Sequence, residues 1–415
     1  MSTRNQNDTH QFGEIITRRK FITLASAAAA GMAVIPLGGS AMAAKTEIVI
    51  GATLSQSGRF QGIIRPFGKL LQVWADGINA KGGIYLRKIN KTLPIRLVIY
   101  DDQSSPPTAL KFYERLAAVD KVDFFMGPFT SFITNAALQA AVKHKRPMFM
   151  VEANDSAMFE KPNRWRATGL SPAKTEYTRV VQLLAKKGGV KTFALLSRDS
   201  LHENQAMEGF GEMVKKAGME VVYQKIAPKD TRDFSSIILA MKQSKPDVVF
   251  IEWIPPPGNI GFLKRARALG LNPKDVVVGH APVPVIKALG RSMENVLSAL
   301  YFFEGDSPHH REFFAMCKKA GFEPWQYSEA GIRYVTFKRI EEALVTAGSL
   351  EPEDVRRAMW QSNFSLYDGD IRIKTDKKGY GTLHPWPSQI KNGKPVSLWP
   401  LSKGVEIFEH KNGQW

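Results

Sequence analysis

Short apolar runs alternate with longer segments in which apolar residues recur at helical spacing, beginning near residue 47. The first part of this pattern predicts strands over 47–53, 95–100, 122–126 and 148–151, with helices over 67–78, 108–119 and 133–142 between them. Pro66 and Pro107 stand near two of the helix starts, and Gly82-Gly83 follows the first helix. Strands that alternate with helices form parallel sheets covered on both faces, so we expect a doubly wound α/β lobe.

The same pattern restarts near residue 178 and predicts a second α/β lobe of similar size. Its expected helices are 178–187, 203–217, 234–243 and 260–269, and its expected strands are 192–196, 220–224, 247–253, 276–279 and 296–303. Helices over 309–320, 328–347 and 352–361 follow, and the tail, 366–415, carries short strands among Gly, Pro and Asn. The repetition is one of architecture, because the two halves share no repeated sequence.

The N-terminus has the order of segments that is typical of an export leader. Arg18-Arg19 precedes a weakly apolar run over 21–33, and Ala41-Met42-Ala43 offers a small-residue cleavage site. The arginine pair makes residues 1–43 resemble a twin-arginine (Tat) signal peptide. The alternative is a membrane-anchoring helix, but the run lacks the roughly 20 unbroken apolar residues that a bilayer requires. We expect cleavage before Ala44 and a soluble protein in the periplasm.

The chain as a whole is strongly basic. The chain of 415 residues has 44% hydrophobic residues and a net charge of +18. Its Lys and Arg residues are scattered without a run of five, which favours a basic surface facing an anionic membrane or anionic ligands over nucleic-acid binding. The single cysteine, Cys317, cannot form an internal disulfide, and a small buried apolar residue is the favoured interpretation.

Motifs of catalysis and of cofactor binding are absent from the sequence. It contains no P-loop, no G-x-G-x-x-G, no G-x-S-x-G, no H-E-x-x-H and no C-x-x-C. His309 and His310 are adjacent, but neighbouring residues on a helix point in different directions, so a shared metal is not expected there. Asp101-Asp102 could act as an acid/base pair, although a solvated turn at a strand end is the favoured alternative. We expect a binding protein with no enzymatic activity, no cofactor and no metal.

Five motifs, taken in order, resemble those of the branched-chain amino acid type of ABC-transporter substrate-binding protein. They are IGATLSQSG at 50–58, INAKGGI at 78–84, YDDQSSP at 100–106, GPFTS at 127–131 and FLKRARALG at 262–270. Each motif alone is weak, but together they span nearly the whole mature chain in the family's order and spacing.

The resemblance implies a type I periplasmic binding fold, in which two Rossmann-like lobes joined by three crossings close on a ligand between them. We place lobe 1 at 44–168 and 302–368, and lobe 2 at 169–301 and 369–415. The implied function is the delivery of a small solute to an inner-membrane permease driven by a cytoplasmic ATPase. A periplasmic sensor of the same fold, acting on a membrane receptor, is the alternative. We expect a monomer that binds no nucleic acid.

Ligands bind at the carboxyl ends of strands in open parallel sheets, so the loops there are the candidate site. The GPFTS loop precedes a helix expected to begin near Ile133, where free N–H groups favour an anion. In the family, the residue matching Ser131 and the loop after the next strand hold an α-carboxylate. Ser131 could instead be a simple helix cap. The candidate ligand-binding residues are Ser57, Thr130, Ser131, Phe132, Glu152, Ala153, Asn154, His202, Trp253 and His280.

Several positions depart from the pattern of amino-acid binders. Glu152 and Asn154 occupy a loop that usually carries small residues and a Thr, and a buried Glu needs a partner. His202 replaces a Tyr, and Ala281 replaces an acid that would bind the ligand's ammonium group. Trp253 could line the cleft or belong to the core. We therefore expect an amino acid or a related small carboxylate or amide as the solute, aromatic ones included.

Overall fold

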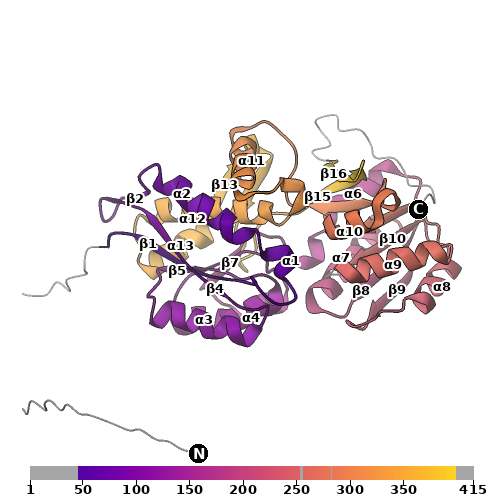
Figure 1. The fold of residues 1–415 in the computed structure, drawn as a ribbon, viewed down its shortest axis with the longest axis horizontal. Helices are drawn as coiled ribbons and strands as arrows, with labels where there is room; N and C mark the ends of the chain where they lie inside the picture. The colour runs from indigo at the N-terminus through magenta and orange to yellow at the C-terminus, as the bar shows by residue number, and fades with distance from the viewer. Residues whose placement is uncertain (1–44, 253–255, 282, 399–415) are drawn as a thin grey trace, which may run out of the picture. The chain divides into compact units, whose positions relative to one another are not determined.

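A computed structural model of the protein describes residues 45–252, 256–281 and 283–398 (Figure 1). Contacts group the chain from Lys45 onward into one compact unit. The predicted export leader with its cleavage site, Trp253, and residues 399–415 of the expected second lobe lie outside the described residues. Within the ranges described, no helix has the length and apolar character needed to cross a membrane.

The first lobe is built on a five-stranded parallel sheet with the order β4-β1-β5-β6-β7. Its strands are β1 (Ile48–Leu54), β4 (Ile95–Asp101), β5 (Phe124–Met126), β6 (Met148–Met150) and β7 (Arg166–Thr168). Its helices are α1 (Gln61–Ile64), α2 (Phe67–Asn79), α3 (Pro106–Ala118), α4 (Ser131–Lys143) and α5 (Ala157–Glu160). In β1, Ile48 and Ile50 enter the core on one face of the sheet and Val49 enters the core on the other.

The second lobe carries a seven-stranded sheet with the order β16-β15-β12-β11-β10-β8-β9. The parallel strands are β8 (Thr192–Arg198), β9 (Glu220–Ala227), β10 (Val248–Glu252), β11 (Asp275–Val278) and β12 (Leu297–Leu300). Two antiparallel strands, β15 (Trp386–Lys391) and β16 (Lys394–Ser397), extend it. The helices are α6 (Thr178–Lys187), α7 (Leu201–Lys216), α8 (Ser235–Gln243), α9 (Pro256–Ala268) and α10 (Val283–Leu289). Strand β10 sends alternate residues into two cores, so this sheet is also covered on both faces.

After β12 the chain returns to the first lobe as three helices. These are α11 (Pro308–Ala320), α12 (Ala330–Ala347) and α13 (Pro352–Gln361). Helix α12 packs on the first core, where Phe337 stacks on Trp74 with ring centroids 4.5 Å apart. The expected boundary between residues 368 and 369 needs a correction. Strand β14 (Ile371–Lys374) pairs with β13 (Asn363–Leu366) across it, so the return to the larger sheet comes only before β15.

Short elements complete the fold. An antiparallel hairpin joins β2 (Ile84–Leu86) to β3 (Lys91–Leu93), and neither strand was expected. Four 3₁₀ turns, η1 (Ala173–Thr175), η2 (Gly290–Met293), η3 (Pro324–Gln326) and η4 (Tyr367–Gly369), lie within the described residues. Turn η1 matters for the site, because it comes directly before Glu176 and packs against helix α7.

Candidate ligand site

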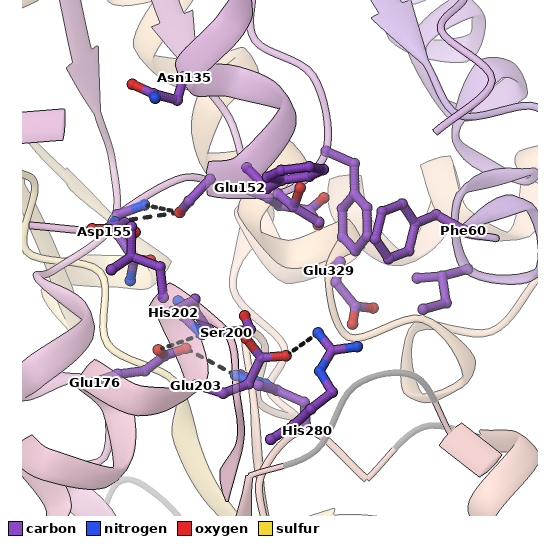
Figure 2. Close-up of a pocket in the computed structure, with 18 of the residues that line it drawn as sticks. Phe60, Asn135, Glu152, Asp155, Glu176, Ser200, His202, Glu203, His280 and Glu329 are labelled. Atoms are coloured by element: carbon purple, nitrogen blue, oxygen red, sulfur yellow. Dashed lines mark hydrogen bonds and ion pairs between the residues drawn. The ribbon is translucent and has the colours of Figure 1, made fainter. Parts of the chain in front are cut away.

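A cavity of about 600 Å³ lies where strands of both sheets end (Figure 2). The first lobe contributes residues from 59–63 after β1, from 129–135 after β5 and from 152–158 after β6. The second lobe contributes Glu176, residues 198–203 after β8, and His280 after β11. The start of helix α12 adds Glu329 and Ile332. The cavity is therefore bounded by segments that are far apart in the sequence.

Most of the candidate residues line this cavity. They are Thr130, Ser131, Phe132, Glu152, Asn154, His202 and His280. Ser57 does not, because its hydroxyl donates to Asp101 Oδ2 at 2.6 Å and holds the turn after β1. Ala153 is fully buried in the core on the other face of the sheet. These two residues therefore do not belong to the lining of the site.

Thr130 and Ser131 have separate roles at the start of α4. Thr130 is the N-cap, and its hydroxyl accepts the N–H of Ile133 at 3.4 Å. Its φ of 65° lies in the left-handed region, which is a strained conformation for a β-branched residue. Ser131 is the first helical residue, and its Oγ accepts the N–H groups of Asn154 and Asp155, each at 3.3 Å. The hydroxyl of Ser131 thus keeps its proton to donate to an acceptor in the cavity.

Aromatic rings form one wall of the cavity beside this helix start. Phe60 meets Phe129 edge to face, with centroids 5.0 Å apart. Phe132 is 59% exposed, which leaves part of its ring available to a bound molecule. The guanidinium of Arg59 lies 4.5 Å from the Phe60 centroid and 5.5 Å from the Phe132 centroid. This wall offers apolar surface with one positive charge at its edge.

Glu152 and Asn154, two of the polar candidates, already have partners within the protein. Glu152 forms a buried ion pair with Arg333 of α12, whose guanidinium also lies 3.6 Å from the Phe67 centroid. The amide of Asn154 donates to the carbonyl of Ser171 at 3.0 Å. The sequence indicated that a buried Glu152 would need a partner, but Arg333 is 181 residues away and carried no signal of this pairing.

A second cluster of polar side chains surrounds Glu176, on the second lobe's side of the cavity (Figure 2). His280 Nε2 lies 2.8 Å from Glu176 Oε1, and His202 Nε2 lies 3.4 Å from Glu176 Oε2. The hydroxyl of Tyr301 also donates to Glu176 Oε1. Burial alone would raise the pKa of Glu176, but the charge of His202 and the contact with His280 lower it to about 2. Burial likewise opposes the charge on His280, and Glu176 raises its pKa to about 9.

A further buried carboxyl lies next to this group, at the end of strand β10. Burial raises the pKa of Glu252 to about 7, and Tyr177 donates its hydroxyl to Glu252 Oε2 at 2.6 Å. A Cβ on Gly279 would lie 1.7 Å from the same oxygen. A side chain at position 279, the residue before His280, would therefore displace the Glu252 carboxyl.

This two-lobed architecture matches a known protein family. The family model described as "Periplasmic binding protein" matches residues 47–388. The chain belongs to this family.

Individual relatives agree with this assignment. The Leu/Ile/Val-binding protein homolog 7 of Brucella melitensis is 25% identical over 88% of this chain and 92% of its own length. A branched-chain amino acid transporter substrate-binding protein from Streptococcus pneumoniae, solved with isoleucine, has a TM-score of 0.71 at 19% identity, covering 85% of this chain and 100% of that one. A solute-binding protein from R. palustris, solved with 4-hydroxybenzoate, also has a TM-score of 0.71, at 20% identity, covering 85% and 95%. The predicted type I periplasmic binding fold is confirmed, and the relatives support the predicted branched-chain amino acid type.

Glu176, Tyr301 and Asp155 are among the residues of this periplasmic binding protein's cavity that were not candidates. Glu176 follows a short 3₁₀ turn and precedes a helix, so it does not lie at the end of a strand, where ligand-binding residues were expected. Tyr301 does follow a strand end, but the predicted strand ran to residue 303 and concealed it. Asp155 lies in the same loop as Glu152 and Asn154, but nothing in the sequence distinguished it as a ligand-binding residue. A shorter strand over 297–300 would have pointed to Tyr301.

Proposed function

We propose that this protein is the extracytoplasmic solute-binding component of an ABC importer for a small carboxylate with an apolar body. The observation that supports this most is the cavity at the strand ends of both sheets, with the start of α4 and the Ser131 hydroxyl on its lining. Binding would hold the two lobes together around the solute, and the closed form would pass it to an inner-membrane permease with a cytoplasmic ATPase. No chemical turnover is part of this function.

The carboxylate of the solute would bind at the start of α4. The first N–H groups of a helix have no partner within the helix, and the helix dipole favours negative charge there. Ser131 adds a hydroxyl donor, because its Oγ already accepts two backbone N–H groups. Arg59 supplies a positive charge across the aromatic wall. Isoleucine and 4-hydroxybenzoate, the ligands of the two solved relatives, each carry one carboxylate.

The body of the solute would pack on Phe60, Phe129 and Phe132. An aromatic or branched aliphatic group fits such a wall through burial and ring stacking. The state of Glu152 favours an aromatic carboxylate over an amino acid, because this carboxylate is paired with Arg333 and is not free for an ammonium group. The amino acid remains the competing solute, since the family's relatives include Leu/Ile/Val-binding protein homologues.

Identification of the bound solute tests the proposal. The protein is purified after export, its ligand is extracted for mass spectrometry, and the ligand-free protein is titrated calorimetrically with benzoate-type acids and with amino acids. We expect one small carboxylate per chain and the tighter binding for aromatic acids. Tighter binding of amino acids would overturn the preference for aromatic acids, and no binding of any carboxylate would overturn the function.

A deletion strain separates uptake from sensing. We expect loss of uptake of the identified solute when the gene is removed, and its return when the gene is supplied. Normal uptake together with loss of a transcriptional response to the solute would point to a periplasmic sensor instead.

Localisation in the periplasm, through the Tat-like leader with cleavage before Ala44, is part of the proposal. Replacing Arg18 and Arg19 by Lys should retain the precursor in the cytoplasm, and normal export of this variant would contradict the Tat route.

A further inference from the structure

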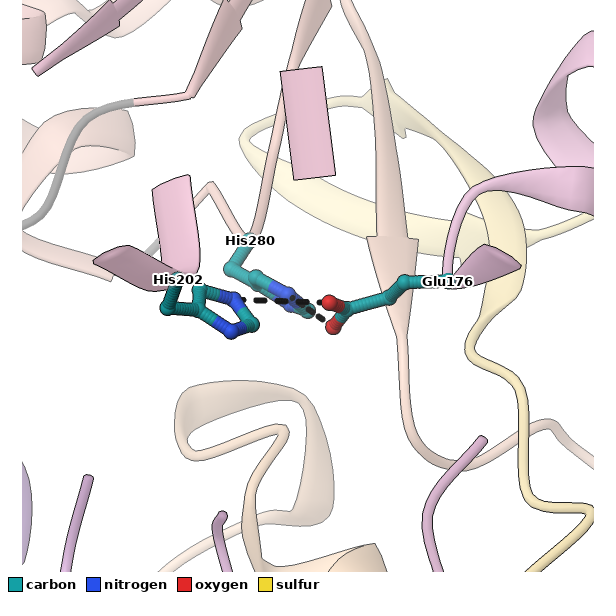
Figure 3. Close-up of side chains that lie close together, drawn as sticks. All are labelled: Glu176, His202 and His280. Atoms are coloured by element: carbon teal, nitrogen blue, oxygen red, sulfur yellow. Dashed lines mark hydrogen bonds and ion pairs between the residues drawn. The ribbon is translucent and has the colours of Figure 1, made fainter. Parts of the chain in front are cut away.

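Three side chains with metal-binding atoms converge at the second lobe's side of the cavity (Figure 3). They come from three separate segments: Glu176 follows η1, His202 is in the first turn of α7, and His280 follows β11. One ligand atom of each lies within 4.8 Å of the others. Among the described residues, this is the one group of three or more His, Cys, Asp or Glu side chains that meets that condition.

The donor set and its spacing fit a divalent ion of the zinc type. Two imidazoles and one carboxylate are ligands that zinc accepts, at bond lengths of about 2.0–2.2 Å. Ligand atoms around a tetrahedral ion of this size lie roughly 3.3–3.5 Å apart. The separation of His202 Nε2 from Glu176 Oε2 is 3.4 Å, and that of His280 Nε2 from Glu176 Oε1 is 2.8 Å. Both separations are close to this range, and the three ligand atoms all lie within 4.8 Å of one another.

The surroundings of Glu176 also point to a ligand. Its side chain is 1% exposed, and its Oε2 has no hydrogen-bond partner among the described residues, although His202 lies beside it. A buried carboxylate oxygen without a hydrogen bond calls for an explanation. Glu176 Oε1 receives the hydroxyl of Tyr301, and the Tyr301 ring stacks on His280 with centroids 5.3 Å apart. Such outer contacts orient metal ligands in proteins.

We propose that Glu176, His202 and His280 bind a divalent transition-metal ion of the zinc type, with an open coordination position toward the cavity. Three protein ligands leave the fourth position to water or to an anionic group of a bound molecule. Two neutral imidazoles and one carboxylate leave the ion with a net charge of +1, so the site attracts an oxygen donor. This proposal does not depend on which solute the cavity takes.

Metal titration of the full protein, carrying no polyhistidine tag and freed of metal with EDTA, tests the proposal. We expect zinc chloride to bind with a stoichiometry of one ion per chain, and cobalt chloride to give the visible absorption of a tetrahedral or five-coordinate site. His280→Gln and His202→Gln should each weaken zinc binding by at least about 100-fold, the upper end of what loss of an outer contact does. Zinc should also raise the melting temperature, and EDTA should reverse that rise.

His144→Gln is the matched control, because His144 Nε2 lies 2.7 Å from Glu114 outside the cavity, with no second histidine in that pair. It should bind zinc as the wild type does. His202 is partly exposed, so its variant should fold even if the His280 variant does not. Absence of saturable zinc binding by the wild type would overturn the proposal. Equal zinc binding by the wild type and His202→Gln would do the same and would leave the group as an internal ion pair.

Discussion

At the scale of single residues, the sequence identified a helix start that lines the cavity but not the partners of the buried charges around it. The GPFTS motif placed Thr130 and Ser131 at the start of a helix, and both line the cavity. The structure then divides their roles, because Thr130 caps the helix and Ser131 points its hydroxyl group at the next loop. The partners Arg333 and Glu176 could not be found in this way, since an ion pair depends on contacts between distant segments.

Ser131→Ala should weaken solute binding by about 1–3 kcal/mol, the contribution of one hydrogen bond to a charged group. This corresponds to about a 5- to 150-fold rise in the dissociation constant measured by calorimetry. Ser105→Ala is the control, because Ser105 caps α3 with its side chain and does not line the cavity. It should lower stability and leave affinity unchanged. Equal affinities for Ser131→Ala and the wild type would show that Ser131 does not contact the solute.

Glu152→Gln should destabilise the protein by about 3–5 kcal/mol, because it leaves the buried Arg333 without its counter-ion. Burial alone already lowers the pKa of Arg333 well below its usual value. The measurement is urea unfolding of the single variant and of the double variant Glu152→Leu/Arg333→Met. The double variant should regain most of the lost stability, since it removes both charges. A single variant as stable as the wild type would contradict the structural role of this pair.

At the scale of elements, hydrophobic periodicity predicted the long helices and every parallel strand of the two sheets except β7. The helices α6 and α13 have the predicted bounds, and α4 begins two residues before the expected start. The pattern missed the hairpin β2–β3, because strands of three residues are too short to show alternation. It also gave no pairing of β15 with the parallel strands, since the antiparallel partner of β15 there is β12, almost ninety residues earlier.

Gly209 allows α7 to lie directly against the turn that presents Glu176. A Cβ on Gly209 would lie 1.8 Å from the carbonyl oxygen of Lys174 in η1. Gly209→Ala should therefore cost about 1–3 kcal/mol of stability, the usual range for overpacking, and should also weaken zinc binding by moving Glu176 relative to His202. Gly77→Ala in α2 is the control, because nothing lies within 4 Å of its added Cβ. It should stabilise the protein slightly, by about 0.5–1 kcal/mol. Equal melting temperatures for Gly209→Ala and the wild type would contradict this close contact.

At the scale of the whole molecule, hydrogen bonds join one lobe to the other at Asp155, which lines the cavity. Gln205 of α7 donates to Asp155 Oδ1 at 3.1 Å and accepts the N–H of Ser156 at 2.9 Å. Asp155 is buried and Gln205 nearly so, so this contact lies in a region with little solvent, and this burial raises the pKa of Asp155. The residues that join the lobes therefore come from α7 and from the loop after β6. Two-lobe organisation was predictable from the restart of the α/β pattern, but this contact between the lobes was not.

Gln205→Ala removes both of these hydrogen bonds and should favour the open arrangement of the lobes. We expect about 1–3 kcal/mol weaker solute binding, because closure then requires more of the binding energy. Gln72→Ala, which removes a bond to Asp76 within the exposed face of α2, is the control and should bind as the wild type does. Unchanged affinity of the Gln205 variant would mean that this contact does not contribute to closure.

Small-angle X-ray scattering of the protein with and without its identified solute tests the central claim most directly. The claim is that the solute is captured by closure of the two lobes around the cavity. We predict that the radius of gyration falls when the solute saturates the protein, and that Gln205→Ala shows a smaller fall at the same occupancy. Scattering profiles that coincide in the presence and absence of the solute, with binding confirmed by calorimetry on the same sample, would contradict the account.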